Sequence, residues 1–265
     1  MENQFDAKDM SPFGQTLILL FIAILLTLLS GLLINLLVRF VPLISDYSIL
    51  LNYLLSFGSF FFVVRFLWQI DRLDTNKLPF SAYLILLPAI LSLLFLTEAL
   101  VSLIPMPKYF EDLFSGMISL DLKGYLTVGI AAPILEEFIF RGLILKGLLQ
   151  RYQAKKAIIW SAVIFGVIHL NPWQFVPAFI IGLFIGWIYW KTQSVWPGVF
   201  IHFVNNSFSF YVGYRFQDIN TSFSELLGGG PLYVFSLLIA LVVCWASFKW
   251  IQNYFKENCN LIQNQ

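Results

Sequence analysis

Charged residues are scarce in this chain. They make up 12% of its 265 residues, whereas a soluble domain carries about 25%. Because charged side chains cover much of the surface of a soluble protein, so small a supply argues against that class. The mean hydropathy of +0.80 agrees, and the composition indicates a membrane protein. The net charge of +1 also argues against a nucleic-acid partner.

Several signatures are missing. The two cysteines cannot form a disulfide framework and say little about the redox compartment. We find no H-E-x-x-H zinc motif, no Ser-His-Asp arrangement and no glycine-rich phosphate loop. No A-x-A-like cleavage site follows the first apolar run, so we interpret that run as a retained helix and not a signal peptide. Without internal repeats or a soluble insertion, residues 1–265 are predicted to form a single membrane domain.

Long apolar runs, in contrast, are abundant. A bilayer span needs about 20 mainly apolar residues, and eight runs are candidates. The predicted fold is therefore all-α, a polytopic membrane protein of about eight transmembrane helices. The predicted spans are 15–38, 48–68, 81–103, 124–150, 155–171, 173–190, 195–214 and 231–252.

Lysine and arginine predict the orientation of these spans. Most of them, Lys8 included, fall in the N-terminus, in the loops after spans two, four and six, and in the C-terminus. Because cytoplasmic loops carry an excess of these residues, both termini are expected to be cytoplasmic. Segment 104–123 mixes charges with large apolar residues. It is either an amphipathic helix on the outer interface or a structured loop.

Three charges interrupt the fourth span, in the stretch APILEEFIFRG. Glu137 and Arg141 are four residues apart, so they share a helix face and can form an ion pair. Glu136 points about 100° away and has no such partner. All three could merely hold helices together. However, an unpaired carboxylate inside a membrane is by default a functional hypothesis, and Glu136 is our candidate general base.

The chain has only two histidines, and both lie inside predicted spans. His169 follows Phe165 by four residues, and Asn206 follows His202 by four. Each pair therefore shares a helix face. Donors at His202 and Asn206 would suit a pocket for a developing oxyanion. The alternative for each pair is hydrogen bonding between helices.

The depth of these residues favours one shared site. Glu136, His169 and Asn206 each lie 14 or 15 residues from a cytoplasmic charge on the same span, counted from Arg151, Lys155 and Lys191 respectively. At 1.5 Å per residue, these three and His202 lie roughly 16–23 Å from those charges. Independent packing contacts would have no reason to share one level.

Two further features have weaker meaning. Gly182 and Gly186 form a GxxxG pattern, which lets helices approach closely. Glu98 in the third span has no obvious partner in the sequence. It could contribute to the site or lie near the outer interface, and we favour the interface.

A carboxylate, two imidazoles and an amide at one depth fit hydrolysis by activated water. Glu136 would take the proton, with His169 orienting the water, and His202 and Asn206 would stabilise the oxyanion. In an alternative version, Glu136, His169 and His202 bind zinc and leave one position open. The metal-free version is favoured, because Glu136 and His169 can activate water unaided, so no cofactor is required.

These residues carry a family resemblance. E-E-x-x-x-R (Glu136, Glu137, Arg141), F-x-x-x-H (Phe165, His169) and H-x-x-x-N (His202, Asn206) occur in this order within a core of about 124–210. The sequence thus resembles the CPBP intramembrane proteases, which include the Abi proteins and the Ras-converting CAAX endopeptidase. Many members have T-G-S before the third motif, where this chain has Gln193 in place of the glycine.

The resemblance implies an eight-helix fold with an intramembrane active-site cavity, and peptide-bond hydrolysis. Glu136, His169, His202 and Asn206 would be catalytic, supported by Glu137, Arg141 and Phe165. Often such enzymes are labelled metalloproteases. The expected partners are the lipid bilayer and a membrane protein or lipidated peptide as substrate, of CAAX type or another.

The compact chain suits a bacterial-type member in the plasma membrane. Two alternative functions remain open: a proton-coupled transporter with a buried Glu–His relay, and a non-catalytic immunity or scaffold protein that acts by binding.

Overall fold

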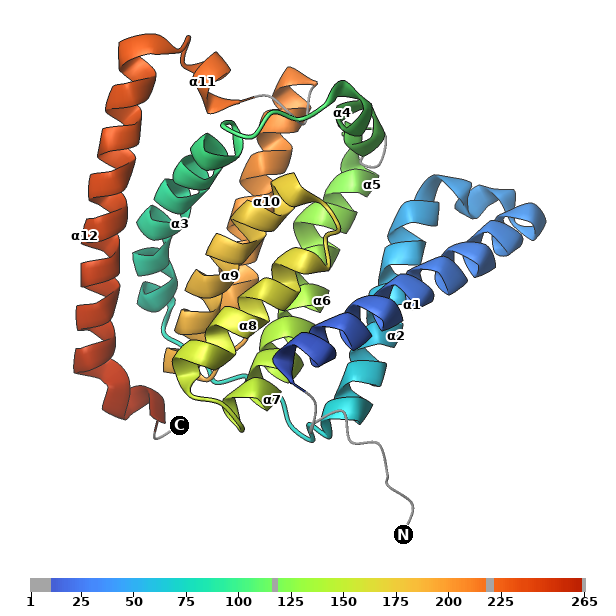
Figure 1. Cartoon of the computed structure of the whole chain (residues 1–265), viewed down its shortest axis with the longest axis horizontal. Helices are drawn as coiled ribbons and strands as arrows, with labels where there is room; N and C mark the ends of the chain where they lie inside the picture. The colour runs from blue at the N-terminus through green and yellow to red at the C-terminus, as the bar shows by residue number, and fades with distance from the viewer. Residues whose placement is uncertain (1–10, 116–118, 218–221, 264–265) are drawn as a thin grey trace.

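The computed structural model describes residues 11–115, 119–217 and 222–263, and these contain helices but no strand. Eight long helical segments follow the predicted spans (Figure 1). They are α1 (Pro12–Phe40), α2 (Ser48–Trp68), α3 (Phe80–Val101), a continuous run over 122–149, α8 (Ala154–Val167), α9 (Pro172–Thr192), α10 (Trp196–Phe216) and α12 (Gly230–Gln263).

An all-α polytopic membrane protein is confirmed. Within the described residues, five stretches are long and apolar enough to cross a membrane by length and composition. The predicted fifth span is wrong at its end, because α8 stops at Val167 and has only 14 residues. The five stretches are Pro12–Phe40, Pro42–Trp68, Phe80–Val101, Pro172–Thr192 and Gly230–Glu257.

The helices form a bundle with an outlying pair on each side (Figure 1). α1 and α2 make a hairpin at one side, and α12 lies beside α3 at the other. Between them stand α8, α9, α10 and the run over 122–149. The start of α1 and the end of α12 lie at the same end of the bundle (Figure 1).

The run over 122–149 is not a regular α-helix. It consists of α5 (Leu122–Tyr125), α6 (Ala132–Ile139) and α7 (Lys146–Leu149), joined by two π-helical turns. These turns, η3 (Leu126–Ala131) and η4 (Phe140–Leu145), flank α6 on both sides. π-helical turns occur frequently at functional sites, and here they bracket the E-E-x-x-x-R motif.

The GxxxG pattern has the predicted packing role. A methyl group added to Gly182 would lie 3.2 Å from the Ala162 Cβ, and one added to Gly186 would lie 3.1 Å from the Ile158 Cγ2. Both distances are tighter than ordinary contact. The two glycines therefore let α9 approach α8 closely.

Hydrogen bonds attach the loop between α2 and α3 to the helices that carry the motifs. The Asp74 carboxylate accepts hydrogen bonds from Lys146 Nζ at 2.5 Å and from the Tyr189 hydroxyl at 2.7 Å. The Val195 N–H donates to the Asp74 carbonyl at 3.0 Å. This loop thus ties α7, α9 and the start of α10 together at one end of the bundle.

Two predictions concern the end of the bundle opposite Asp74. Segment 104–123 contains a helix, α4 (Lys108–Ser115), although residues 116–118, like Lys8, lie outside the described residues. The indole N–H of Trp173 donates to the Ile104 carbonyl at 3.1 Å, which attaches the start of this segment to α9. The expectation that Glu98 has no partner is wrong, because its Oε1 accepts from the Phe223 N–H at 3.3 Å.

Replacing Asp74 with alanine should destabilise the bundle. The change removes one charge-assisted pair and one further hydrogen bond to a carboxylate, so the free energy of unfolding is expected to fall by about 2–4 kcal/mol. Thermal unfolding of the detergent-solubilised protein measures the effect. The exposed Asp71 of the same loop, changed to alanine, is the control, and equal unfolding temperatures for the two variants would contradict the assignment.

Candidate active site

The predicted site residues come from three neighbouring parts of the bundle. α6 and η4 supply the first motif, α8 and the turn after it supply the second, and α10 supplies the third. In order, they are Glu136, Glu137, Arg141, Phe165, His169, His202 and Asn206.

The predicted ion pair between Glu137 and Arg141 is present. Arg141 Nη1 donates to Glu137 Oε1 at 2.7 Å, and the two side chains are 1% and 0% exposed. Arg141 Nη2 also donates to the Gly182 carbonyl at 3.3 Å. Burying two charges is costly unless they are paired and hydrogen-bonded. This pair is hydrogen-bonded and joins η4 to α9, while Glu137 Oε2 and Arg141 Nε have no hydrogen-bond partner among the described residues.

Glu137 has a second partner that fixes the tautomer of His202. His202 Nδ1 lies 3.0 Å from Glu137 Oε1. The Glu137 oxygen already accepts from Arg141 and is an acceptor toward His202 as well, so His202 Nδ1 is the donor. The neutral His202 ring therefore has a bare Nε2. Contrary to our expectation, His202 can donate to an oxyanion from Nε2 only when it is protonated.

His169 is the same tautomer as His202, with the ring hydrogen on Nδ1. Its Nδ1 lies 2.7 Å from the Phe165 carbonyl oxygen, which can only accept. Nδ1 thus carries the hydrogen, and Nε2 of the neutral ring is an acceptor. This arrangement suits the predicted role of orienting a water through one of its hydrogens.

Phe165 packs between the polar residues of the site. Its ring lies edge-on to the rings of His169 and His202, with centroids 5.2 and 5.7 Å away. The Arg141 guanidinium carbon lies 4.6 Å from its centroid. Phe165 thus brings His169 into the same cluster as the charged residues.

Glu136 is buried, and the prediction that it lacks a partner is wrong. The hydroxyl of Tyr53 on α2 donates to Glu136 Oε1 at 2.6 Å. The other oxygen, Oε2, is buried and has no hydrogen-bond partner among the described residues. It lies 3.9 Å from His202 Nε2, so an acceptor oxygen and a bare ring nitrogen face each other.

Asn206 has one amide hydrogen committed to the backbone. Its Nδ2 donates to the Val128 carbonyl at 2.9 Å, and its Oδ1 accepts from Asn205 Nδ2 at 3.1 Å. An amide has two hydrogens, so one remains for a substrate oxygen. The carbonyl of Val128 comes from η3, so that π-helical turn helps orient Asn206.

The ligand set proposed for zinc is only partly assembled. Within the described residues, no group of three or more His, Cys, Asp or Glu side chains could hold a metal ion. Glu136 Oε2 and His202 Nε2 lie 3.9 Å apart. The His169 ring contacts the Phe165 ring, which in turn contacts the His202 ring. These positions do not form the expected three-ligand set.

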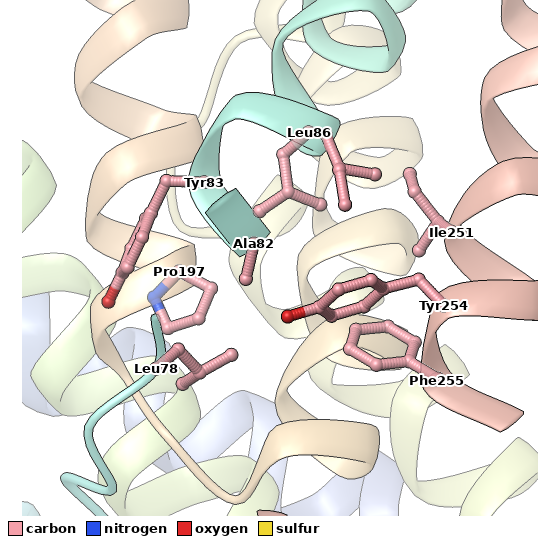
Figure 2. Close-up of a pocket in the computed structure, with 9 residues that line it drawn as sticks. Leu78, Ala82, Tyr83, Leu86, Pro197, Ile251, Tyr254 and Phe255 are labelled. Carbon is pink, nitrogen blue, oxygen red and sulfur yellow. The ribbon is translucent and has the colours of Figure 1, made fainter. Parts of the chain in front are cut away.

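An apolar pocket lies away from these residues. It is formed where the start of α3 meets α10 and α12, and Tyr83, Pro197 and Phe255 are among its lining side chains (Figure 2). A second, apolar groove runs along α6 and α10, where Ile134 and Phe203 contribute to it. Neither is lined by Glu136 or by a histidine.

The site residues lie in a segment that matches a known protein family. Residues 119–208 match the sequence model of a family described as type II CAAX prenyl endopeptidase Rce1-like. The resemblance is confirmed. The matched Rce1-like segment contains every predicted site residue, from Glu136 to Asn206.

Two curated proteins are similar to parts of the chain. “Putative membrane peptidase YdiL” of Bacillus subtilis is 33% identical over 79 residues, which cover 30% of this chain and 32% of that protein. “UPF0177 protein YxdF” of Lactococcus lactis is 26% identical over 112 residues, which cover 42% of this chain and 59% of that protein. The matches thus span about a third and three fifths of these relatives. No solved structure matches the chain.

Gly198 packs directly against the site, and no pattern in the sequence marks it. A methyl group there would lie 2.7 Å from Glu137 Oε2 and 2.8 Å from the Ile185 Cγ2. Both are shorter than real Cβ contacts. Only glycine therefore lets α10 come close enough for His202 to bond with Glu137.

Gly198→Ala should displace the Glu137 carboxylate or α10. We expect a loss of about 1–3 kcal/mol in the free energy of unfolding, the usual cost of overpacking. Gly58→Ala is the matched control, because nothing lies within 4 Å of the added methyl group. Thermal unfolding of both variants tests this, and a Gly198→Ala protein as stable as Gly58→Ala would refute it.

Proposed function

We propose that the chain is an intramembrane endopeptidase in which Glu136 activates a water molecule. The observation that carries this proposal is the buried, unpartnered Oε2 of Glu136 opposite the bare Nε2 of His202. An ionised or polar group without a partner is costly inside a protein. A function that needs a free acceptor there gives a reason for keeping it.

The proposed reaction is hydrolysis of a peptide bond. Glu136 Oε2 takes a proton from water while the water oxygen attacks the carbonyl carbon of the substrate. His169 Nε2 accepts the other hydrogen of that water and orients it. When the tetrahedral intermediate collapses, the carbon–nitrogen bond breaks and the proton on Glu136 passes to the leaving amine.

His202 and Asn206 would stabilise the negative charge of the intermediate. Asn206 has one amide hydrogen free for the oxyanion. The neutral His202 ring has no hydrogen on Nε2, so it would join this role only while it holds the proton that Glu136 Oε2, 3.9 Å away, has taken from water. The Glu137 carboxylate at 3.0 Å would stabilise that imidazolium until the proton returns through Glu136 to the leaving amine. Donors aimed at developing charge in a site without bulk water are among the strongest catalytic contributions.

The proposed substrate is a membrane protein or a lipidated peptide. The family matched by residues 119–208 is described by its action on CAAX prenyl substrates, and one relative carries the name of a membrane peptidase. A site within an integral membrane bundle favours a bond that already lies at the bilayer. We place this activity in a bacterial plasma membrane with both termini of the chain cytoplasmic.

Glu136→Gln should abolish cleavage while leaving the fold intact. The amide keeps the size of the side chain but cannot take a proton from water, so the rate is expected to fall by at least about 10²-fold. Wild-type and variant chains are expressed in cells that lack the protein, and the peptide termini in their membranes are sequenced. Glu257→Gln, an exposed change on α12, is the control.

New termini that persist in Glu136→Gln would refute the role of Glu136. If the wild-type chain gives no termini beyond those of cells that lack the protein, the protease proposal fails, and proton transport or binding becomes the better explanation for the buried carboxylate.

Cleavage should survive a zinc chelator. No step of the proposed reaction requires a metal, and the three expected ligands do not assemble into a cluster among the described residues. The purified protein is dialysed against a chelator and assayed for cleavage. Loss of cleavage that zinc restores would favour the zinc version with Glu136, His169 and His202.

A further inference from the structure

The hydroxyl of Tyr53 reaches the proposed catalytic carboxylate from outside the matched segment. Tyr53 belongs to α2, 83 positions before Glu136 in the chain, whereas the family match covers only residues 119–208. The α1–α2 hairpin stands at the side of the bundle (Figure 1). The group that holds Glu136 is thus contributed by a part of the fold outside the family match.

The position of the Tyr53 ring is itself well fixed. It stacks on Phe57 one turn later, with centroids 4.4 Å apart and planes at 16°. Phe57 in turn packs edge-on against Phe60, which is 2% exposed within the main apolar core. An aromatic ring supported in this way has little freedom, so its hydroxyl stays where Glu136 Oε1 meets it.

A carboxylate has two oxygens that exchange places when its last torsion turns, and that torsion is soft. The hydrogen bond of 2.6 Å from the Tyr53 hydroxyl to Glu136 Oε1 restricts this rotation. It leaves Oε2 as the oxygen that faces His202. A site loses rate steeply when its reacting atoms are misplaced by about 1 Å, so fixing one oxygen has a direct use.

We infer that Tyr53 is a positioning residue for Glu136: it occupies one carboxylate oxygen and thereby presents the other to the water. This inference rests on the proposed function. Tyr53 does not touch the substrate and transfers no proton. It acts only through the orientation of Glu136, as outer hydrogen-bond partners orient the ligands of metal sites.

Tyr53→Phe tests the inference, because it removes the hydroxyl and keeps the stacked ring. Tyr125→Phe is the matched control. The Tyr125 hydroxyl also joins two helices, at 3.1 Å from the Ser207 hydroxyl, but does not contact Glu136. Both full-length proteins are purified in lipid vesicles and assayed on a peptide that spans the cut site found by terminus sequencing.

We expect kcat of Tyr53→Phe to fall about 10- to 100-fold, with KM within about twofold of wild type. Tyr125→Phe should keep the wild-type kcat, and both variants should unfold at similar temperatures. A fall in kcat without a change in KM distinguishes misorientation of Glu136 from a general loosening of the bundle. Equal kcat values for the two variants would overturn the inference, as would a rise in KM alone.

A second measurement uses the shorter carboxylate of Glu136→Asp. That side chain is one methylene shorter, so the Tyr53 hydroxyl can no longer hold it in the same way. Adding Tyr53→Phe to Glu136→Asp should therefore lower kcat no further. Effects that multiply independently would show that Tyr53 acts elsewhere. If Glu136→Gln cleaves normally, the proposed function fails. If Glu136→Gln is inactive and Tyr53→Phe is fully active, only the positioning role fails.

Discussion

The buried carboxylate of Glu137 is the interaction on which the rest of the site depends. It lies completely inside the protein and accepts from both Arg141 and His202 through the same oxygen. An uncompensated charge at such a place costs several kcal/mol, and removing one partner of a buried pair costs about 3–5 kcal/mol. The helices that supply these partners must therefore stay close together.

This close approach of the helices explains why glycines and an aromatic ring surround the Glu137 carboxylate. Gly198 lets α10 come close to Glu137, and Gly182 presents its carbonyl to Arg141 at the contact between α9 and α8. Phe165 places its ring under the guanidinium and between the two imidazoles. Packing and charge are thus satisfied by the same residues.

The direction of each hydrogen bond then decides the chemistry. Since Glu137 and the Phe165 carbonyl only accept, both histidines carry their hydrogen on Nδ1 and leave Nε2 bare. The free oxygen of Glu136 faces one of these nitrogens. Glu136 Oε2 and His202 Nε2 are thus two acceptors that face each other, which suits a molecule that brings hydrogens, such as water.

Composition and periodicity alone determined the helical membrane fold, the pairing of Glu137 with Arg141 and the close packing at Gly182. Each of these three features follows from the spacing of residues along one helix or from the hydropathy of one segment. Spacing and hydropathy can be read from a single sequence. The three motifs in order likewise carried the family resemblance, which the match over residues 119–208 confirmed.

Only the tertiary structure decided which groups meet across helices. The Tyr53 hydroxyl on Glu136, the second partner of Glu137, and the loop held by Asp74 all join residues far apart in the chain. A tyrosine or aspartate has no local pattern that marks such a partner. These contacts depend on how close the helices pack and how they rotate, which the sequence specifies only through the folded whole.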